Sequence, residues 1–283
     1  MKQRIGNFTV KEILPQIYSI GGEGVFRYLL VGEHHALLFD TGVGFSNLRE
    51  CIEEITKLPL YIVNSHGHVD HVGANPQFDQ SIYIHKADVT VYRKHQEIQV
   101  RKIMMDSCKK MQKIFFFMSF FPRRFNEEKY LNGPLFSNFQ YIKEGDIFNL
   151  GGMSVKIYEI PGHTPGSVGL LCKERSVFFT SDAMNRATWL FLPESCSLEV
   201  YKESLQKVMK LEFDYFLTGH ENRLNPKNEI KAYYEIAENP DFENGKIQKE
   251  NEFAPGVEVR RCTEKGKVKN KACLMISQDK IKR

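Results

Sequence analysis

The sequence predicts an α/β fold, a sheet covered by helices, and two observations support this prediction. Short runs rich in β-branched and aromatic residues alternate with segments of helical periodicity, and no fixed-period repeat appears. Hydrophobic residues make up 42% of the chain and charged residues 26%, a balance that lets a globular chain bury a large core. The length of 283 residues suits one large domain, residues 1–240, followed by an appendage, residues 241–283.

The expected strands are short apolar runs bounded by turn residues. They cover residues 26–31, 36–39, 61–64, 81–85, 155–160, 176–180 and 215–218. The expected helices cover residues 47–58, a long stretch from about 86 to 121, and 198–210. The long stretch belongs to a helical insertion over about 86–130.

The helix over 198–210 has the clearest pattern. Apolar residues recur there at the 3/4 spacing of one helical face, and Ser197 is placed to cap the N-terminus. After Asn239-Pro240 the composition changes, and residues 241–255 are polar. We expect a β-hairpin beyond them, formed by 256–261 and 267–276.

Charge and hydropathy exclude several classes of protein. The net charge of +4 arises in residues 241–283, which hold 11 Lys/Arg and 7 Asp/Glu and leave 28 of each in residues 1–240. A neutral main body argues against a nucleic-acid groove.

The N-terminus has no signal-peptide core, and the longest nearly apolar run, 114–121, is too short to span a bilayer. Six cysteines without a CxxC pair are expected to be reduced thiols. We expect a cytoplasmic protein without nucleic-acid or membrane partners.

The sharpest signal is the sequence HGHVDH at residues 66–71, an HxHxDH motif directly after the expected strand 61–64. Four metal-binding side chains so close together cannot share one helical face, but a tight loop at a strand end can spread them around metal ions. Gly67 makes such a loop easier to turn. Histidine with aspartate suits zinc, iron or manganese rather than calcium, which prefers oxygen ligands.

Three more candidate ligands, His163, Asp182 and His220, each come just after an expected strand, and Asp40 does the same. In α/β sheets, sites form beyond the carboxyl ends of the strands, where rigidly held loops converge. Independent accidents would have to place all of these residues at equivalent points, so we interpret them as one metal site. Isolated histidines are more often structural, and we interpret four in this way: His34, His35, His85 and His95.

These motifs resemble those of the metallo-β-lactamase superfamily over residues 40–220. The resemblance implies a four-layer αββα sandwich of two similar halves, with a two-metal site at one edge. The implied ligands are His66, His68 and His163 for one ion and Asp70, His71 and His220 for the other, with Asp182 shared. Asp40 would orient ligands without binding metal itself.

Two divalent ions in such a site can activate a bridging water by lowering its pKa from 15.7 toward roughly 7. Asp70 is the expected proton acceptor and donor. Zinc is the favoured metal, with iron and manganese as alternatives. His68 stands where a diiron redox branch has glutamate, and Asp182 stands where secreted β-lactamases usually have cysteine. The chain therefore looks most like the hydroxyacylglutathione hydrolase and lactonase-like group, which implies hydrolysis of a small-molecule ester, thioester or lactone.

Two stretches are candidates for substrate contacts. Asn185 and Trp189 follow Asp182 and could line the site, or belong to a packed loop. The other stretch, Arg101 to Phe125, carries a Met- and Phe-rich helical stripe, which predicts either core packing or a lid over an apolar substrate. The stripe consists of Met104, Cys108, Met111, Phe115 and Met118, of which Met111 and Phe115 are the proposed substrate contacts.

Two other activities stay open at this point. A phosphodiesterase or nuclease could use the same metals, although the neutral main body disfavours RNA binding. A mononuclear iron enzyme similar to persulfide dioxygenases would differ in metal content. The oligomeric state and the natural substrate are not encoded in any recognisable pattern.

Overall fold

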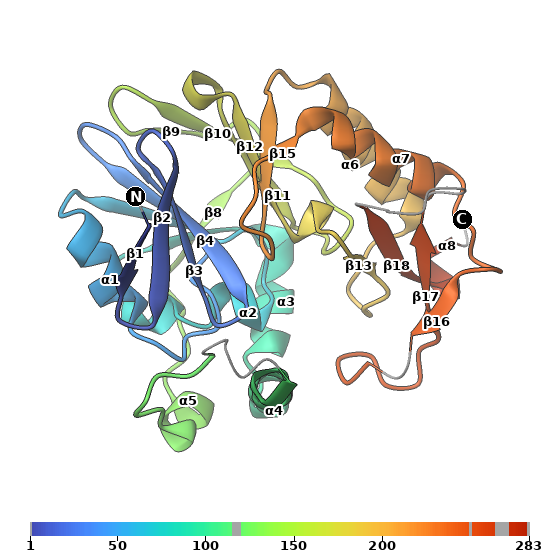
Figure 1. Cartoon of the computed structure of the whole chain (residues 1–283), viewed down its shortest axis with the longest axis horizontal. Helices are drawn as coiled ribbons and strands as arrows, with labels where there is room; N and C mark the ends of the chain where they lie inside the picture. The colour runs from blue at the N-terminus through green and yellow to red at the C-terminus, as the bar shows by residue number, and fades with distance from the viewer. Residues whose placement is uncertain (1, 115–119, 249–250, 264–271, 282–283) are drawn as a thin grey trace. The chain divides into compact units, whose positions relative to one another are not determined.

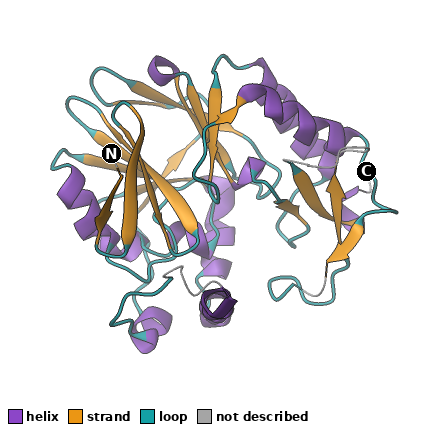
Figure 2. Ribbon diagram, in the orientation of Figure 1, coloured by secondary structure: helices purple, strands orange, loops and turns teal. Residues whose placement is uncertain are grey.

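The computed structural model describes residues 2–114, 120–248, 251–263 and 272–281 (Figure 1). The chain divides into two compact units, Met1–Lys156 and Ile157–Arg283. Each unit contains both strands and helices (Figure 2), so the predicted α/β class is confirmed. The predicted domain boundary near residue 240 stays a prediction.

Unit 1 is built on an eight-stranded sheet whose strands follow the order of the chain. Strands β1 to β5 pair antiparallel, and β5 to β8 pair parallel. The strands are β1 Lys2–Ile5, β2 Phe8–Leu14, β3 Ile17–Gly22, β4 Val25–Val31, β5 Ala36–Phe39, β6 Leu60–Val63, β7 Ile82–His85 and β8 Phe139–Ile142. Because β5 and β6 are parallel neighbours, the segments that follow them, Asp40 and 64–68, emerge at the same edge of the sheet.

The central strands of this sheet bury side chains on both faces. Leu29, Leu38 and Ile62 contribute to one hydrophobic cluster, and the helix α1, Leu48–Ile55, adds Leu48 and Ile52 to it. The intervening residues, such as Leu30 and Leu37, are also fully buried. Both faces of the central strands are therefore covered, which is usual for parallel strands.

The predicted long helix over 86–121 is wrong as a single element. The structure has α3 at Val89–His95 and α4 at Ile98–Ile114, and residues 115–119 lie outside the described part of the chain. Gln96 ends α3 with its backbone N–H on carbonyls of the last turn. The two helices pack on different clusters, since α3 buries Tyr92 with the sheet while α4 buries Met105 with Phe45. The remaining helices of unit 1 are α2 Val69–Val72 and α5 Glu127–Asn132.

A second sheet has the strand order β15-β14-β12-β11-β10-β9, and the boundary between the units falls within β10. The strands are β9 Ile147–Asn149, β10 Ser154–Glu159, β11 Val168–Cys172, β12 Val177–Ser181, β14 Tyr215–Thr218 and β15 Asn225–Pro226. In unit 2, β12 and β14 pair parallel. The segments after these two strands, which carry Asp182 and His220, therefore begin at a common sheet edge.

Helices α6, Leu198–Lys210, and α7, Ile230–Glu238, pack on this part of unit 2. The bounds of α6 and its Ser197 cap confirm the sequence prediction, with the Ser197 side chain accepting from the N–H of Val200. A short helix, α8, covers Gln278–Ile281. Five 3₁₀ turns complete the described elements: η1 Asn75–Gln77, η2 Lys86–Asp88, η3 Lys173–Arg175, η4 Asp182–Met184 and η5 Lys227–Glu229.

The C-terminal stretch forms part of a four-stranded sheet in unit 2. Its strands are β13 Thr188–Leu190, β18 Cys273–Ser277, β17 Val259–Thr263 and β16 Lys246–Gln248. Strands β17 and β18 pair antiparallel, and β18 also pairs in parallel with β13. Residues after 240 are thus joined by a strand ladder to a segment that directly follows Asp182. Among the described residues, no helix has the length and apolar character needed to span a bilayer.

Candidate metal centre

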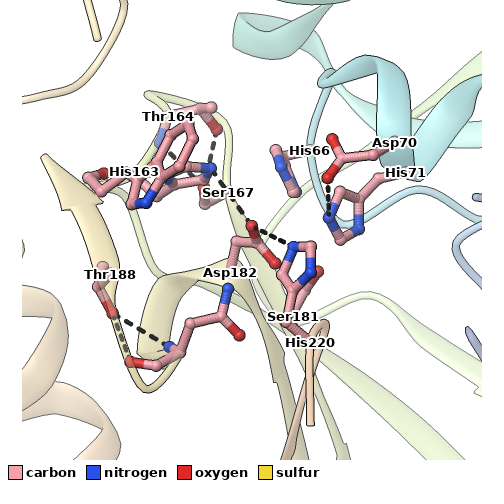
Figure 3. Close-up of polar contacts among 12 residues, drawn as sticks. His66, Asp70, His71, His163, Thr164, Ser167, Ser181, Asp182, Thr188 and His220 are labelled. Carbon is pink, nitrogen blue, oxygen red and sulfur yellow. Dashed lines mark hydrogen bonds and ion pairs between the residues drawn. The ribbon is translucent and has the colours of Figure 1, made fainter. Parts of the chain in front are cut away.

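Unit 1 presents the HxHxDH motif on a loop between β6 and α2. The nitrogens that His66 and His68 offer to a metal lie within 4.8 Å of each other. One turn later, the Asp70 carboxylate lies 3.6 Å from Nε2 of His71 (Figure 3). His68 is the N-cap of the one-turn helix α2, which places Asp70 and His71 in its first turn. The loop-to-helix transition therefore spreads four ligands that no single helical face could hold together.

Asp40 holds this loop from the end of the neighbouring strand. Its Oδ1 accepts the backbone N–H of Ser65 at 2.7 Å, and its Oδ2 accepts the Ser65 hydroxyl at 2.8 Å. The same Oδ2 lies 2.8 Å from Nδ1 of His71. Asp40 has a φ of +67°, which is costly for a residue other than glycine and is retained here by these three contacts. The contacts match the orienting role predicted for Asp40.

These contacts determine which nitrogens of the histidines can bind metal. A carboxylate only accepts hydrogen bonds, so Nδ1 of His71 carries the proton and Nε2 carries the lone pair. The Ser65 hydroxyl donates to Asp40, so it accepts from Nδ1 of His66 at 2.8 Å. His66 therefore also has its lone pair on Nε2. Such outer partners are typical of metal-binding histidines.

Two further residues, Asp88 and His95, support this loop and were not predicted from the sequence. The Asp88 carboxylate is fully buried and accepts the backbone N–H of Gly67 at 2.6 Å. A Cβ on Gly67 would lie 2.5 Å from the backbone nitrogen of Tyr92, so only glycine lets α3 approach this closely. The ring of His95 stacks on that of His68, with centroids 4.2 Å apart. His95 was expected to be an isolated structural residue. It lies 27 positions after His68 in the chain, so no local pattern indicates this contact.

A buried ion pair lies under the segment that follows Asp40. Arg27 and Glu23 are almost completely buried and meet at 2.6 Å. The Arg27 guanidinium donates to the carbonyl of Thr41 at 3.0 Å, and Glu23 accepts the N–H of Ser46 at 2.6 Å. Burial lowers the pKa of Arg27, while the charge of Glu23 opposes that shift. A Cβ on Gly42 would lie 1.7 Å from the guanidinium, so the segment can pass there only as glycine.

Unit 2 brings together the other three predicted ligands. Asp182 Oδ2 lies 3.2 Å from Nε2 of His220 and 3.8 Å from Nε2 of His163 (Figure 3). Strand β12 ends at Ser181, whose φ of +46° and ψ of −125° turn the chain sharply before Asp182. One carboxylate thus lies between two imidazoles, the arrangement expected of a shared ligand.

His163 is oriented by backbone rather than by a carboxylate. Its Nδ1 donates to the carbonyl of Trp189 at 2.8 Å, which leaves the lone pair on Nε2. The Ser195 hydroxyl donates to the carbonyl of His163 at 2.9 Å. Trp189 lies in β13, and its register partner in β18 is Met275. The C-terminal strand β18 therefore supports the carbonyl that orients a metal ligand, and no local sequence pattern predicts this connection.

The predicted substrate residues lie in different surroundings. Trp189 is half-buried and packs on Phe191 and Phe253, with the ring centroids 5.0 Å and 6.3 Å apart. Asn185 is buried, and its N–H donates to the hydroxyl of Thr188. Met111 is 41% exposed, and Phe115 lies outside the described residues. Their contacts with substrate stay a prediction.

The predicted Met- and Phe-rich stripe is partly core. Cys108 is buried with Met105 in a cluster that includes Phe45 and Tyr130, and Met104 packs against it. Burial is the main factor that raises the pKa of the Cys108 thiol to about 12, and the charge of Asp70 adds to the shift. Cys108 is therefore a neutral packing residue at neutral pH. The buried face of α4 thus includes Cys108 of the predicted stripe and also Met105, which lies outside it, whereas Met111 of the stripe is exposed.

The chemistry of these side chains fits divalent metal ions. Three histidines have hydrogen bonds that leave Nε2 as the donor atom, namely His66, His71 and His163. Each unit also supplies at least one carboxylate that can offset ionic charge, Asp70 in unit 1 and Asp182 in unit 2. Imidazole with carboxylate suits zinc, iron or manganese. The described residues therefore include groups of His and Asp that could hold metal ions.

The sequence is similar to those of several known hydrolases. Hydroxyacylglutathione hydrolase GloC of Haemophilus influenzae is 28% identical over 54% of this chain and 62% of its own length. Acyl-coenzyme A thioesterase MBLAC2 of Homo sapiens is 24% identical over 63% of this chain and 63% of its own length. The MBLAC2 protein of Gallus gallus is 23% identical over 83% of this chain and 83% of its own length. The chain thus spans less than two thirds of the length of the first two relatives.

Solved structures confirm the fold. ST1585 from Sulfolobus tokodaii, an archaeal metallo-β-lactamase superfamily protein, has a TM-score of 0.54 at 17% identity, covering 80% of this chain and 87% of its own. TTHA1623 in a di-iron-bound form has a TM-score of 0.53 at 21% identity, covering 78% of this chain and 97% of its own. The family model of the metallo-β-lactamase superfamily matches residues 20–220. With this match over most of its length, the chain belongs to the metallo-β-lactamase superfamily.

Proposed function

We propose that this protein is a dinuclear metal-dependent hydrolase that cleaves a small-molecule ester, thioester or lactone. The observation that carries the proposal is the fixed orientation of three histidines, which all present Nε2 as a metal donor. Following the family pattern, one ion is assigned to His66, His68 and His163 and the other to Asp70, His71 and His220, with Asp182 shared. When bound, two such ions lower the pKa of water toward neutrality and polarise a carbonyl oxygen.

The chain's own residues have distinct tasks in this reaction. Asp70 is less buried than the neighbouring His71, and its side chain is 17% exposed. It is therefore placed to exchange a proton with a reactant that reaches the site from solvent. Asp40 keeps the proton of His71 on Nδ1, so Nε2 stays a metal donor throughout turnover. The carboxylates of Asp70 and Asp182 reduce the net positive charge that the imidazoles cannot offset.

A thioester is the favoured substrate within this class. The named relatives act on thioesters of glutathione or coenzyme A, and the chain shares the family pattern with them over about half of its length or more. The thiolate leaving group of a thioester departs more easily than an alkoxide, so its departure depends less on proton donation by Asp70. Substrate contacts are proposed for Asn185, Trp189, Met111 and Phe115.

Zinc is the proposed metal, with iron or manganese as alternatives. The ligand set contains five histidines and two aspartates, which zinc accepts in tetrahedral or five-coordinate sites. The di-iron-bound form of TTHA1623 supports iron as a second possibility, since its fold is shared by this chain. Metal identity thus depends on supply as well as on ligand type.

The experiment that tests the proposal is a substrate screen with defined metal content. The purified protein is stripped with a chelator, reloaded with zinc, manganese or iron, and assayed with thioester, lactone and phosphodiester substrates. We expect cleavage of a thioester or lactone that requires added metal. Cleavage of phosphodiesters alone would show that the protein is a phosphodiesterase instead. Oxygen consumption by a form with one iron ion would show that it is a dioxygenase.

A further inference from the structure

Helix α4 has a second apolar face in addition to the one that it buries. Its buried residues Arg101, Met105 and Cys108 follow a 4, 3 spacing and define the face toward the cluster around Phe45. A different set follows a 3, 4, 4, 3 spacing and shares another face of the same helix. That set consists of four apolar residues, Val100, Ile103, Met111 and Ile114, with the polar Ser107 between them.

This second face is exposed toward the C-terminal end of the helix. Met111 is 41% exposed and Ile114 is 65% exposed, whereas Val100 and Ile103 are half-buried. A helix that only covers a core needs one apolar stripe and a polar opposite side. The second stripe is therefore not explained by packing on unit 1, and exposed apolar stripes usually mark contact surfaces.

Basic side chains border this stripe. Lys102, Lys110 and Lys113 are exposed on α4, beside the half-buried Asp106. Lys109 pairs with Glu127 at 2.7 Å. Residues 86–131 hold 11 Lys/Arg and 5 Asp/Glu, which leaves 17 Lys/Arg and 23 Asp/Glu in the rest of residues 1–240. The neutral main body of the chain is thus divided into a basic segment that contains α4 and an acidic remainder.

The combination of exposed apolar and basic side chains on one helix points to one kind of partner. An anionic lipid surface attracts lysines through its headgroups and accepts Met and Ile among its acyl chains. RNA would favour the lysines but give Ile114 no apolar environment.

We infer that α4 docks this protein on anionic membrane surfaces through its outer stripe and the bordering lysines. The inference departs from the expectation, based on sequence, that no membrane partner is involved. It does not rest on the proposed hydrolase activity, because vesicle binding is measured without turnover, and it assigns Met111 to the docking surface instead of to the substrate. Ionic strength should weaken the docking, since its electrostatic part is screened over about 10 Å at 0.1 M salt.

The test is sedimentation of the metal-loaded full chain with two kinds of vesicle, phosphatidylcholine alone and phosphatidylcholine mixed with phosphatidylserine. We expect binding to the mixed vesicles and much weaker binding to phosphatidylcholine alone. Lys110→Glu with Lys113→Glu should reduce the partition coefficient at least about twentyfold, because each lysine near an anionic surface contributes about fivefold. Ile114→Ser should reduce it about fivefold by removing an apolar side chain from the bilayer.

Matched controls separate docking from general charge or stability effects. Lys11→Glu with Lys57→Glu makes the same change in net charge at exposed sites outside α4, and Ile147→Ser removes an isoleucine that is 62% exposed on β9. Both controls should bind as the wild type does. All the altered side chains are exposed, so melting temperature and metal content should stay close to those of the wild type.

Three outcomes would overturn the inference. The first is an absence of binding to the mixed vesicles. The second is equal loss of binding in the α4 variants and in their controls, which would show an effect of net charge alone. The third is salt-sensitive binding of single-stranded RNA that needs Lys110 and Lys113 but not Ile114, which would assign the surface to a nucleic acid.

Discussion

The two units hold their metal ligands in different ways. In unit 1, four ligands lie within six residues, and carboxylates buried elsewhere in the unit fix the loop, Asp40 through His71 and Asp88 through Gly67. In unit 2, three ligands follow three different strands, and a backbone carbonyl orients His163. Unit 1 thus depends on side chains that can be altered singly, whereas unit 2 depends on the sheet that carries its ligands.

The two units also differ in how far their metal ligands are exposed to solvent. His66 and His71 are almost completely buried, whereas the side chain of His220 is 36% exposed. A buried ligand with a fixed tautomer is preorganised and loses little freedom when it binds metal. An exposed ligand must be ordered by the metal or by a neighbour such as Asp182. We therefore expect unit 1 to tolerate loss of one support better than unit 2 tolerates loss of Asp182.

Replacing Asp182 should have the largest effect. Asp182→Ala removes the carboxylate that lies beside both His163 and His220, so the purified variant should lose at least one metal ion per chain. Turnover should fall by more than about a hundredfold, which exceeds the usual effect of losing an outer partner. Metal analysis by mass spectrometry together with a thioester assay measures both. A variant with unchanged metal content would remove Asp182 from the ligand set.

The next substitution, at Asp70, should lower the rate of turnover more than the stability of the fold. Asp70→Asn keeps the size of the side chain but cannot accept a proton, so kcat should fall by about a hundredfold or more. The melting temperature of the metal-loaded variant should change much less than that of Asp182→Ala. Comparison of kcat with thermal unfolding separates the two. Turnover equal to that of the wild type would exclude Asp70 as the proton acceptor.

The support of unit 1 can be tested at Asp40. Asp40→Asn loses the acceptor for Nδ1 of His71 and for the Ser65 hydroxyl, so metal affinity should fall by about ten- to a hundredfold. Asp79→Asn is a matched control, because Asp79 lies in unit 1 and its exposed carboxylate contacts Arg49 instead. Competition with a chromogenic chelator measures both affinities. Equal affinities in the two variants would show that Asp40 does not tune the ligands.

The smallest effect on the ligands should come from the buried ion pair under the Asp40 segment. Arg27→Met leaves Glu23 charged and buried, so it should lower the free energy of unfolding by about 3 to 5 kcal/mol. Arg27→Met with Glu23→Leu removes both charges and should recover much of that loss. Urea unfolding of the metal-free chain measures the two variants. If the double variant is less stable than the single one, the pair holds the segment through its hydrogen bonds rather than through compensation of charge.

The sequence predicted those parts of the molecule that depend on local pattern. The bounds and cap of α6 follow from apolar spacing and Ser197, and both are local signals. The ligands follow from the HxHxDH motif and from residues at strand ends, which the structure places after β5, β6, β10, β12 and β14. Strands β1 to β3 were not predicted; β1, for example, is mostly exposed and lacks a continuous apolar run.

The missed parts depend on contacts between distant residues. Nothing near Gln96 marks the end of α3, since neither proline nor glycine stands there. The roles of Asp88, His95 and Arg27 arise only when the fold brings them to the HxHxDH loop or to the segment after Asp40. The support of His163 by β18 likewise joins residues about 110 positions apart through β13. Such supports carry no pattern of their own in the sequence.

The most direct test of the account is the number of metal ions that the chain binds. The full chain, purified without chelator and supplied with excess zinc, manganese or iron, should bind two ions per chain by mass spectrometry and equilibrium dialysis. The shared position proposed for Asp182 predicts that Asp182→Ala binds fewer than two ions per chain under the same conditions. One ion per chain under all three metals would contradict the dinuclear hydrolase.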